Sequence, residues 1–391
     1  MRILFLSTWY PYPPDNGSKL RVYNLLRGLA QSHHVTLISF TDEPPANSPP
    51  ALEALCTAVY AIPRRAYRPA RPLALLSLLS PTPRVIVDTY TPAMARQIER
   101  ALQAQDFHLV VASQWSTAAY CQTFLGMPAV FEEIEVGVFQ SKISQATSPA
   151  RRFRHRLTLL KLQFYLRRLL PHFRMCTVAS ATEATLLRRL VPACHSVEII
   201  PNCVSLADYG DMGVKPQPNS LVFAGSLSYA ANHDAMIWFL GQVYPRIRAS
   251  LPAVRLTITG DHASQPLPSA DNLTMTGLVD DVRPLVTASW VSLAPIRLGG
   301  GTRLKILEAM ALRTPVVATS KGAEGLEVQH DEHLLIADTP EAFAEAVIRL
   351  LRESGLRQRL ADNAYELVRR KYDWRMVLPR FLQLIERVAP A

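Results

Sequence analysis

The sequence predicts an α/β protein made of two doubly wound, Rossmann-like domains, each a parallel sheet covered by helices. At 391 residues, with 49% apolar and 19% charged residues, the chain is globular and too long for one ordinary core. Short apolar segments alternate with amphipathic segments of helical period through both halves, which is typical of parallel sheets. Glycines and polar residues follow several strands, where open α/β sheets bind ligands.

The N-terminal half begins with a strand–loop–helix–strand pattern. An apolar strand at residues 3–7 leads into a proline-rich loop, a helix expected at residues 19–31, and a strand at residues 35–40. Gly17 precedes that helix, and two interpretations stay open for it: a simple turn glycine, or a residue that lets backbone amides face a ligand. Gln114 follows the next buried strand, residues 109–112, at the edge expected to contact ligands.

A group of carboxylates follows the strand expected at residues 128–131. These are Glu132, Glu133 and Glu135, separated only by Ile134. The favoured interpretation is that they are solvated loop charges. The alternative is that they contact substrate hydroxyls at the end of the strand.

The net charge of +10 lies entirely in the N-terminal half. Residues 1–200 hold 22 Lys and Arg against 12 Asp and Glu, whereas residues 201–391 hold 20 of each. The densest segment, residues 151–174, places its arginines around an apolar stripe at helical spacing, made of Phe153, Leu157, Leu160 and Phe164. Two interpretations stay open: a helix that lies on an anionic membrane, helped by the arginines at positions 64, 65, 68 and 71, or a surface helix that packs its stripe on its own domain.

The second half repeats the α/β alternation after a hinge at Pro201-Asn202. We expect an N-terminal acceptor-binding domain at residues 1–203 and a C-terminal nucleotide-sugar-binding domain at residues 204–371. Residues 372–391 are expected to form a helix that packs back toward the N-terminal domain.

The most informative stretch is residues 293–312, LAPIRLGGGTRLKILEAMAL. It reads as a buried strand, a loop with Gly299, Gly300 and Gly301, and a helix that Thr302 would cap. Unpaired amides at a helix start carry partial positive charge, and glycines let a ligand approach them closely. Arg303 and Lys305 beside that helix start would hold a diphosphate, and Glu308 one turn later suits the vicinal hydroxyls of a ribose.

Several function classes are disfavoured by missing motifs. The sequence has no P-loop, no Gly-x-Gly-x-x-Gly after the first strand and no Gly-x-Ser-x-Gly elbow. It has no pattern of metal ligands, so we expect no metal and no cofactor. The five cysteines are scattered, which favours reduced thiols in a cytoplasmic protein.

The chain resembles the retaining glycosyltransferases of family 4, which have the GT-B fold, two Rossmann-like domains facing a central cleft. The resemblance lies in residues 14–29, Ile200-Pro201-Asn202, Phe223-Ala224-Gly225, residues 299–311 and Thr314-Pro315-Val316-Val317-Ala318. Residues 225–239 also resemble a bacterial subgroup associated with exopolysaccharide synthesis. The resemblance implies metal-independent transfer of a hexose, with retention of configuration, from a nucleotide sugar, UDP- or GDP-linked, bound by the C-terminal domain.

The resemblance also implies roles for residues. Glu308 matches the family's second glutamate, which holds the ribose, and the first falls at Gly300. The family's two diphosphate cations fall at Ser226 and Asn232, so Arg303 and Lys305 are expected to replace them as the catalytic cations. The remaining donor-binding residues are expected at Gly225, Ser226, Gly277, Leu278, Val279, Gly299, Gly300, Gly301 and Thr302, and the acceptor or phosphate loop at Gly17, Gln114 and Glu135.

The expected acceptor is a saccharide or a lipid-linked saccharide, met at the inner face of the cytoplasmic membrane, and no nucleic acid is expected as a partner. Two other functions stay open. One is a nucleotide-sugar epimerase of the same fold. The other is a catalytically degenerate paralogue that only binds nucleotide, because several of the family's common positions are substituted.

Overall fold

The chain folds into two compact units. A computed structural model describes residues 1–43, 47–210, 212–262 and 265–389, so the end of the expected C-terminal segment 372–391 lies outside the described residues. The first unit comprises residues 1–202 together with residues from 378 onward, and the second comprises residues 203–377.

The first unit is built on a seven-stranded sheet, and every strand pair in it is parallel. Residues 3–6 and the whole of β4 and β5 are buried on both faces, as expected for strands covered by helices on each side. The spatial order is β3-β2-β1-β4-β5-β6-β7. The strands are β1 (Arg2–Ser7), β2 (His34–Thr41), β3 (Ala58–Pro63), β4 (Leu109–Ser113), β5 (Ala129–Glu132), β6 (Met175–Val178) and β7 (Val197–Ile199).

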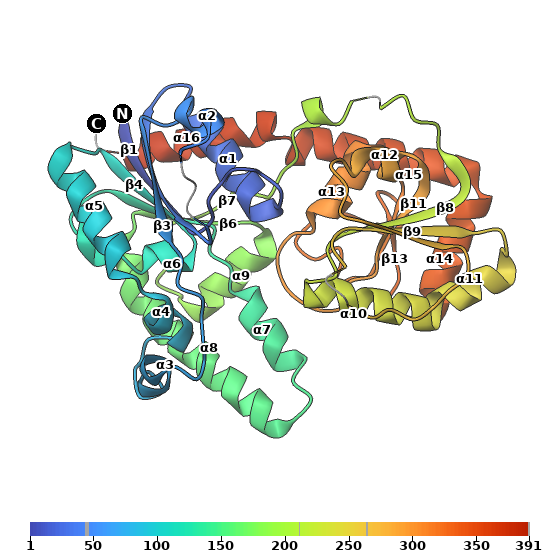
Figure 1. Ribbon diagram of the computed structural model, residues 1–391, viewed down its shortest axis with the longest axis horizontal. Helices are drawn as coiled ribbons and strands as arrows, with labels where there is room; N and C mark the ends of the chain where they lie inside the picture. Colours follow the sequence, from blue (N-terminus) through green and yellow to red (C-terminus); the bar gives the residue numbers. More distant parts are fainter. Residues whose placement is uncertain (44–46, 211, 263–264, 390–391) are drawn as a thin grey trace. The chain divides into compact units, whose positions relative to one another are not determined.

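Helices cover both faces of this sheet (Figure 1). Side-chain caps define several starts: Asn16 accepts a hydrogen bond from the amide of Lys19, and Ser148 from that of Arg151. The helices are α1 (Gly17–Leu29), α2 (Pro50–Glu53), α3 (Pro72–Leu76), α4 (Arg84–Thr89), α5 (Pro92–Ala104), α6 (Trp115–Ala118), α7 (Gly137–Ser144), α8 (Pro149–Leu169) and α9 (Ala181–Leu190), with short 3-10 turns η1 (Cys121–Phe124) and η2 (Leu170–His172).

The last helix, α16 (Trp374–Val388), starts in the second unit and ends in the first. Arg174 donates a hydrogen bond to the carbonyl of Val388, and Arg387 pairs with Glu198 of β7. Gly28 of α1 has no side chain because a Cβ there would lie 2.7 Å from a methyl group of Leu378. These contacts hold the end of the chain against α1 and the β6–β7 side of the first unit.

The second unit has a six-stranded parallel sheet in the order β10-β9-β8-β11-β12-β13. Its strands are β8 (Gln217–Ala224), β9 (Arg255–Thr259), β10 (Leu273–Gly277), β11 (Ser289–Ala294), β12 (Val316–Ala318) and β13 (Leu335–Ile336). Its helices are α10 (Ala230–Trp238), α11 (Tyr244–Ser250), α12 (Arg283–Thr287), α13 (Leu304–Ala311), α14 (Pro340–Arg352) and α15 (Ser354–Leu367), with the 3-10 turn η3 (Leu206–Asp208) and the π-turns η4 (Phe239–Val243) and η5 (Val368–Tyr372).

The predicted α/β class with two Rossmann-like domains is therefore confirmed. In both sheets the first strand is central, and the strand order reverses between β1 and β4 and between β8 and β11. Loops at such a reversal diverge to opposite faces of the sheet and leave a crevice at the carboxyl ends of the strands. The residues after β1 and β4, and those after β8 and β11, therefore occupy the positions where a ligand would bind.

The structure excludes one of the two interpretations of the basic helix. The stripe of Phe153, Leu157, Leu160 and Phe164 is exposed on α8, so the interpretation that packs it on its own domain is wrong. The helix packs instead through Leu162, Leu166 and Leu169, which lie on the opposite side. Among the described residues no helix is both long enough and apolar enough to cross a bilayer.

Candidate functional site

Three loops at the carboxyl edge of the second unit carry the predicted donor residues. Gly225 and Ser226 follow β8, Gly277 to Val279 end and follow β10, and the glycine loop at residues 299–301 joins β11 to α13. The strand order β10-β9-β8-β11 brings these loops to one edge of the sheet, and the reversal of strand order lies between the first loop and the third.

Lys305, in the first turn of α13, reaches across to the loop after β8. Its Nζ donates a hydrogen bond of 3.0 Å to Oδ1 of Asn232, and Nδ2 of Asn232 donates one of 2.8 Å to the carbonyl of Ser226. A Cβ at position 225 would lie 2.6 Å from Nζ of Lys305, so only glycine leaves the ammonium its place. The cation thus contacts Asn232, the position at which the family resemblance expects a diphosphate-binding lysine.

The environment of Lys305 makes its charge costly without an anion. Burial, together with the nearby charge of Arg303, lowers its pKa to about 7, although the carboxylate of Glu308 acts in the opposite direction. Nζ lies 4.0 Å from the ring centroid of Phe223, which stabilises the charged form only in part. An anion bound here would restore the proton and be held by it.

Arg303 occupies the N-cap position of α13, and the prediction that Thr302 caps the helix is wrong. The helix starts at Leu304, and no side chain caps it, so its first amides are left for another partner. The guanidinium of Arg303 donates to the carbonyl of Leu298, while its buried Nε has no hydrogen-bond partner. A Cβ at Gly299, whose φ is +90°, would lie 3.2 Å from this guanidinium and 2.9 Å from the hydroxyl of Tyr229.

Glu308 lies one turn beyond Lys305 on α13. Its Oε1 accepts a hydrogen bond of 3.2 Å from the hydroxyl of Tyr209, a residue that sequence reasoning missed. Burial raises the pKa of Glu308, while the hydrogen bond from Tyr209 and the charge of Lys305 act in the opposite direction. One carboxylate oxygen therefore has an internal partner, and the carboxylate keeps acceptor capacity for hydroxyl groups.

The loop after β10 exposes an apolar side chain. Leu278 is 83% exposed, and Gly277 before it adopts φ of +74°. The amide of Gly277 donates to Nε2 of His262, which follows β9. An exposed leucine on a loop pinned in this way offers an apolar surface to a planar ligand such as a nucleotide base. His262 was missed, although its position just beyond a strand end was a signal.

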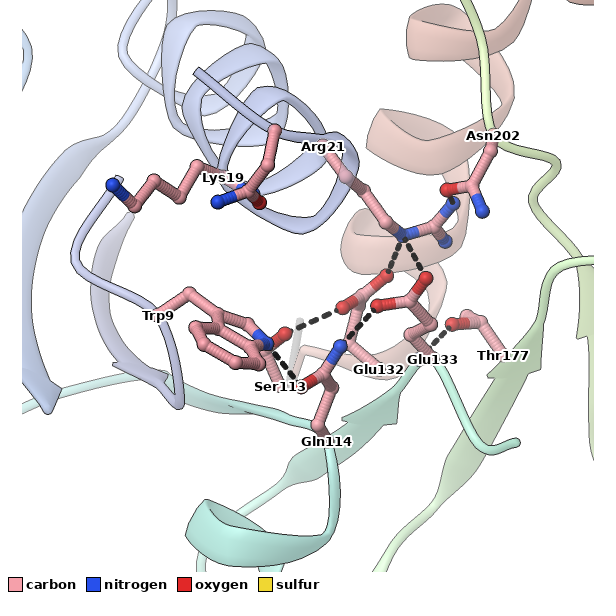
Figure 2. A network of polar contacts seen from close by, with 10 residues as sticks. Trp9, Lys19, Arg21, Ser113, Gln114, Glu132, Glu133, Thr177 and Asn202 are labelled. Atoms are coloured by element: carbon pink, nitrogen blue, oxygen red, sulfur yellow. Dashed lines mark hydrogen bonds and ion pairs between the residues drawn. The ribbon is translucent and has the colours of Figure 1, made fainter. Parts of the chain in front are cut away.

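In the first unit a buried ion pair lies at the edge formed by β1, β4 and β5 (Figure 2). Arg21 of α1 is almost inaccessible, and its Nε lies 2.7 Å from Oε1 of the fully buried Glu132. Ser113 donates to the other oxygen of Glu132, because these two residues are direct neighbours on β4 and β5. Nη1 of Arg21 also donates to Oδ1 of Asn202, in the linker at the end of this unit.

The network continues through two residues with left-handed backbone. Gln114 (φ of 69°) donates to the carboxylate of Glu133 (φ of 58°) and accepts from the indole of Trp9. Burial raises the pKa of Glu133, which the charge of Arg21 opposes. The favoured interpretation of Glu132 and Glu133 as solvated loop charges is therefore wrong. Strand β5 ends beside the buried Arg21, and a buried charge must be paired inside the unit. The glutamates at the end of the strand provide that pairing.

Of the three predicted acceptor residues, Gln114 is part of this network. Gly17 and Glu135 lie outside its central hydrogen bonds. Gly17 is the first residue of α1, four residues before Arg21. Glu135 lies beyond the bend after β5, and its carbonyl accepts a hydrogen bond from the indole of Trp115. Arg21 itself was missed. The sequence feature that could have identified it is a charged residue on the side of α1 that also carries Leu25 and Leu29, which is the side expected to be buried.

A cavity of about 410 Å³ opens beside the network, at the ends of β1, β2 and β3. Its walls include Trp9, Tyr12, Lys19, Asp42 and Arg64. Arg64 makes a two-pronged ion pair with Asp42 and stacks over Trp9 at 4.5 Å. Aromatic rings next to paired charges suit a ligand that combines apolar faces with many hydroxyl groups, as a saccharide does.

Comparisons with known families match both units of the chain. Residues 16–203 match the family model described as "Glycosyl transferase 4-like domain". Residues 218–353 match the family model described as "Glycosyl transferases group 1". The first match covers Arg21, Gln114 and Glu132, and the second covers the loops and helix that carry Lys305 and Glu308.

Curated relatives match part of the chain. An "Uncharacterized 44.6 kDa protein in cps region" of Klebsiella pneumoniae is 28% identical over 169 residues, 40% of this chain and 44% of that protein. A "Phosphatidyl-myo-inositol mannosyltransferase" of Mycobacterium leprae is 29% identical over 208 residues, 51% of this chain and 53% of that protein. The chain thus aligns with about half the length of these relatives.

Solved structures match the whole chain at low identity. A sucrose-phosphate synthase from Thermosynechococcus elongatus has a TM-score of 0.74 at 18% identity, with 99% of each chain covered. Anabaena HepE in complex with UDP and glucose has a TM-score of 0.67 at 14% identity, covering 99% of this chain and 100% of that one. At this identity the likeness concerns the fold, and the expected GT-B fold is confirmed.

The buried pair yields a test of its own. Replacing Glu132 with alanine should lower the free energy of unfolding by about 3 kcal/mol, because the buried Arg21 charge would lose its nearest carboxylate and keep the more distant Glu133, 3.7 Å from its Nε. The matched control is Asp42→Ala, which breaks the exposed pair with Arg64 and should cost about 1 kcal/mol or less. Urea unfolding followed by fluorescence measures both. Equal losses in the two variants would contradict a structural role for the Arg21–Glu132 pair.

Proposed function

We propose, from the glycosyl transferase 4-like domain and the glycosyl transferases group 1 domain that this chain contains, that the protein is a metal-independent, retaining hexosyltransferase. Its donor is a UDP- or GDP-linked sugar bound at the edge of β8, β10 and β11. Its acceptor is a hydroxyl of a saccharide or lipid-linked saccharide in cell-surface or exopolysaccharide synthesis. It works as a peripheral protein at the inner face of the cytoplasmic membrane.

One observation carries this proposal: the ammonium of Lys305 is buried beside Gly225 at a reversal of strand order, with its pKa lowered to about 7. A lysine held there without a carboxylate partner is suited to a diphosphate. When the donor's glycosidic bond breaks, negative charge grows on the leaving diphosphate. Lys305, Arg303 and the uncapped amides of α13 stabilise that charge, the role that a metal ion has in other transferases.

The ribose and the base of the donor are assigned to protein groups next to the diphosphate site. Glu308 accepts hydrogen bonds from the ribose hydroxyls, and Leu278 contacts the base. Gly299, Gly300, Gly301 and Thr302 line the approach to the amides of α13. The structure of HepE in complex with UDP and glucose supports a uridine donor, and the cps-region relative supports a role in surface polysaccharide. The cavity beside Trp9 and Tyr12 is assigned to the acceptor.

Product analysis tests the function directly. Purified protein incubated with radiolabelled UDP- and GDP-hexoses and a membrane extract as acceptor should move label into a saccharide or lipid fraction, with the anomeric configuration retained and without inhibition by EDTA. Label that stays in the nucleotide sugar but changes its sugar would indicate an epimerase. Nucleotide binding without any product across all donors would favour a binding-only paralogue.

The leaving-group role predicts a loss of turnover. Arg303→Ala or Lys305→Ala should each lower turnover about a hundredfold or more, the scale of one lost transition-state donor. Arg313→Ala, at the other end of α13 and paired with Asp362, is the control and should retain wild-type turnover. Wild-type rates in both site variants would contradict the assignment.

The same role gives a pH signature. Because a bound diphosphate favours protonated Lys305, affinity for UDP should fall as pH rises above about 7, by up to about tenfold per pH unit. Lys305→Met should remove this dependence and leave only the ionisation of UDP itself. Calorimetric titration between pH 6 and pH 9 measures it.

The ribose contact predicts a uniform loss of binding. Glu308→Gln should weaken the donor sugar and free UDP alike, by about tenfold or more, because the contact lies away from the reacting carbon. It should also reduce the preference of the protein for UDP over 2′-deoxy-UDP. Tyr209→Phe, which removes only the internal partner of Glu308, should keep that preference. Unchanged affinity and preference in Glu308→Gln would make this carboxylate structural.

A further inference from the structure

Helix α8 has two apolar stripes on opposite sides. Leu162, Leu166 and Leu169 pack into the first unit. The other stripe faces solvent: Phe153 is 69% exposed and Leu160 is 61% exposed, with Leu157 and Phe164 exposed between and beyond them. A surface helix needs one apolar side for packing. The second stripe has no partner in the described part of the unit, and a large exposed apolar patch marks an interaction surface.

A second exposed apolar segment accompanies it. At and after α3, Leu76 is 70% exposed and Leu79 is 94% exposed, and Leu73, Leu75 and Leu78 are also exposed. Only the small residues Ala74 and Ser77 of this segment are buried. The segment therefore turns its small side chains inward and its leucines outward. A segment that stabilises the fold would instead bury its large apolar side chains.

Lys161 joins the two segments. Its Nζ donates to the carbonyls of Ser77 and Leu78, and α3 lies beside α8 in Figure 1. We call the combined surface the apolar platform, made of Leu73, Leu75, Leu76, Leu78, Leu79, Phe153, Leu157, Leu160 and Phe164. The lysine holds the leucine segment next to α8, so the two exposed apolar segments are neighbours.

Cations surround this platform without carboxylate partners. Helix α8 contains no carboxylate, and within the described part of the chain none of its cations forms an ion pair. They are Arg151, Arg152, Arg154, Arg156, Lys161, Arg167 and Arg168. Of the four other arginines expected to help, Arg64 pairs with Asp42, and Arg65 and Arg71 pair with the buried Asp88. Only the side chain of Arg68 has no ion pair within the described part of the chain. The free positive charge is thus concentrated on the helix that carries the platform.

We propose that the apolar platform docks on an anionic lipid bilayer, with the leucines after α3 and the outer stripe of α8 inserted at the boundary between headgroups and acyl chains. Unpaired cations beside exposed apolar side chains match the charge and the apolar depth of such a boundary. A nucleic acid would match the cations but not the leucines. The inference rests on the membrane location in the proposed function and extends it, because the leucines, and not the arginines alone, hold the protein there.

Vesicle sedimentation with the full chain tests the proposal. Two lipid compositions are compared, phosphatidylglycerol with phosphatidylcholine, and phosphatidylcholine alone, each at low and high salt. The apolar variant Leu76→Gln/Leu79→Gln/Phe153→Gln/Leu160→Gln keeps every charge and should bind anionic vesicles at least about tenfold more weakly at both salt concentrations. The charge variant, with glutamine at positions 151, 152, 154 and 156, should lose binding mainly at low salt.

The controls separate docking from folding and from catalysis. Leu125→Gln/Met376→Gln changes two exposed apolar residues of other elements and should bind vesicles like the wild type. UDP-dependent thermal stabilisation should be the same in all variants, since none touches the donor site. If UDP fails to bind any of them while docking follows the predicted pattern, the proposed function fails and the docking surface stands.

A second measurement does not depend on multiple substitutions. Leu79→Trp should be quenched by lipids brominated on the upper acyl chain. Wild-type binding by the apolar variant, a lack of quenching, or wild-type protein left in the supernatant with anionic vesicles would each overturn the proposal. So would a wild-type dimer that dissociates in the apolar variant, because a second copy of the chain would then cover the platform.

Discussion

Parallel pairing of every strand is the constraint on which the rest of this structure depends. It sends each strand's carboxyl end to one edge of its sheet, so segments far apart in sequence meet there. Arg21, Ser113, Glu132 and Asn202 converge at this edge in the first unit. The loops after β8, β10 and β11 converge in the second. Each unit thus gathers the polar side chains of its candidate site at the carboxyl edge of its sheet.

The two edges use buried charge differently. In the first unit Arg21 is paired with a carboxylate that is itself hydrogen-bonded, so the charge is balanced inside the protein and helps to fix α1 and the linker at Asn202. In the second unit Lys305 has a neutral partner, Asn232. Its charge is left to be balanced from outside. A buried charge in a close ion pair is structural. A cation that is hydrogen-bonded only to an amide and merely near a carboxylate, as Lys305 is near Glu308, is suited to an anionic ligand.

The outer surface of α8 adds a third arrangement, in which apolar side chains and cations are both exposed. Neither element alone would be informative, since single exposed leucines and solvated arginines are common. Their combination on one helix, joined to a leucine segment by Lys161, distinguishes this face from the rest of the first unit. This combination is the observation on which the proposed membrane docking rests.

The sequence by itself determined the α/β class, the doubly wound pattern in both halves, the loop that holds Gly225 and the helix that holds Lys305 and Glu308, because apolar periodicity and glycine positions are local properties. Only the tertiary structure decided what lies opposite each residue. It paired Glu132 with Arg21, gave Glu308 the partner Tyr209, put Arg303 where Thr302 was expected to cap, and turned the stripe beginning at Phe153 outward. These outcomes depend on contacts between residues distant in sequence. For α8, the sequence pattern does not tell which of its two apolar stripes is buried, because both have the same helical period.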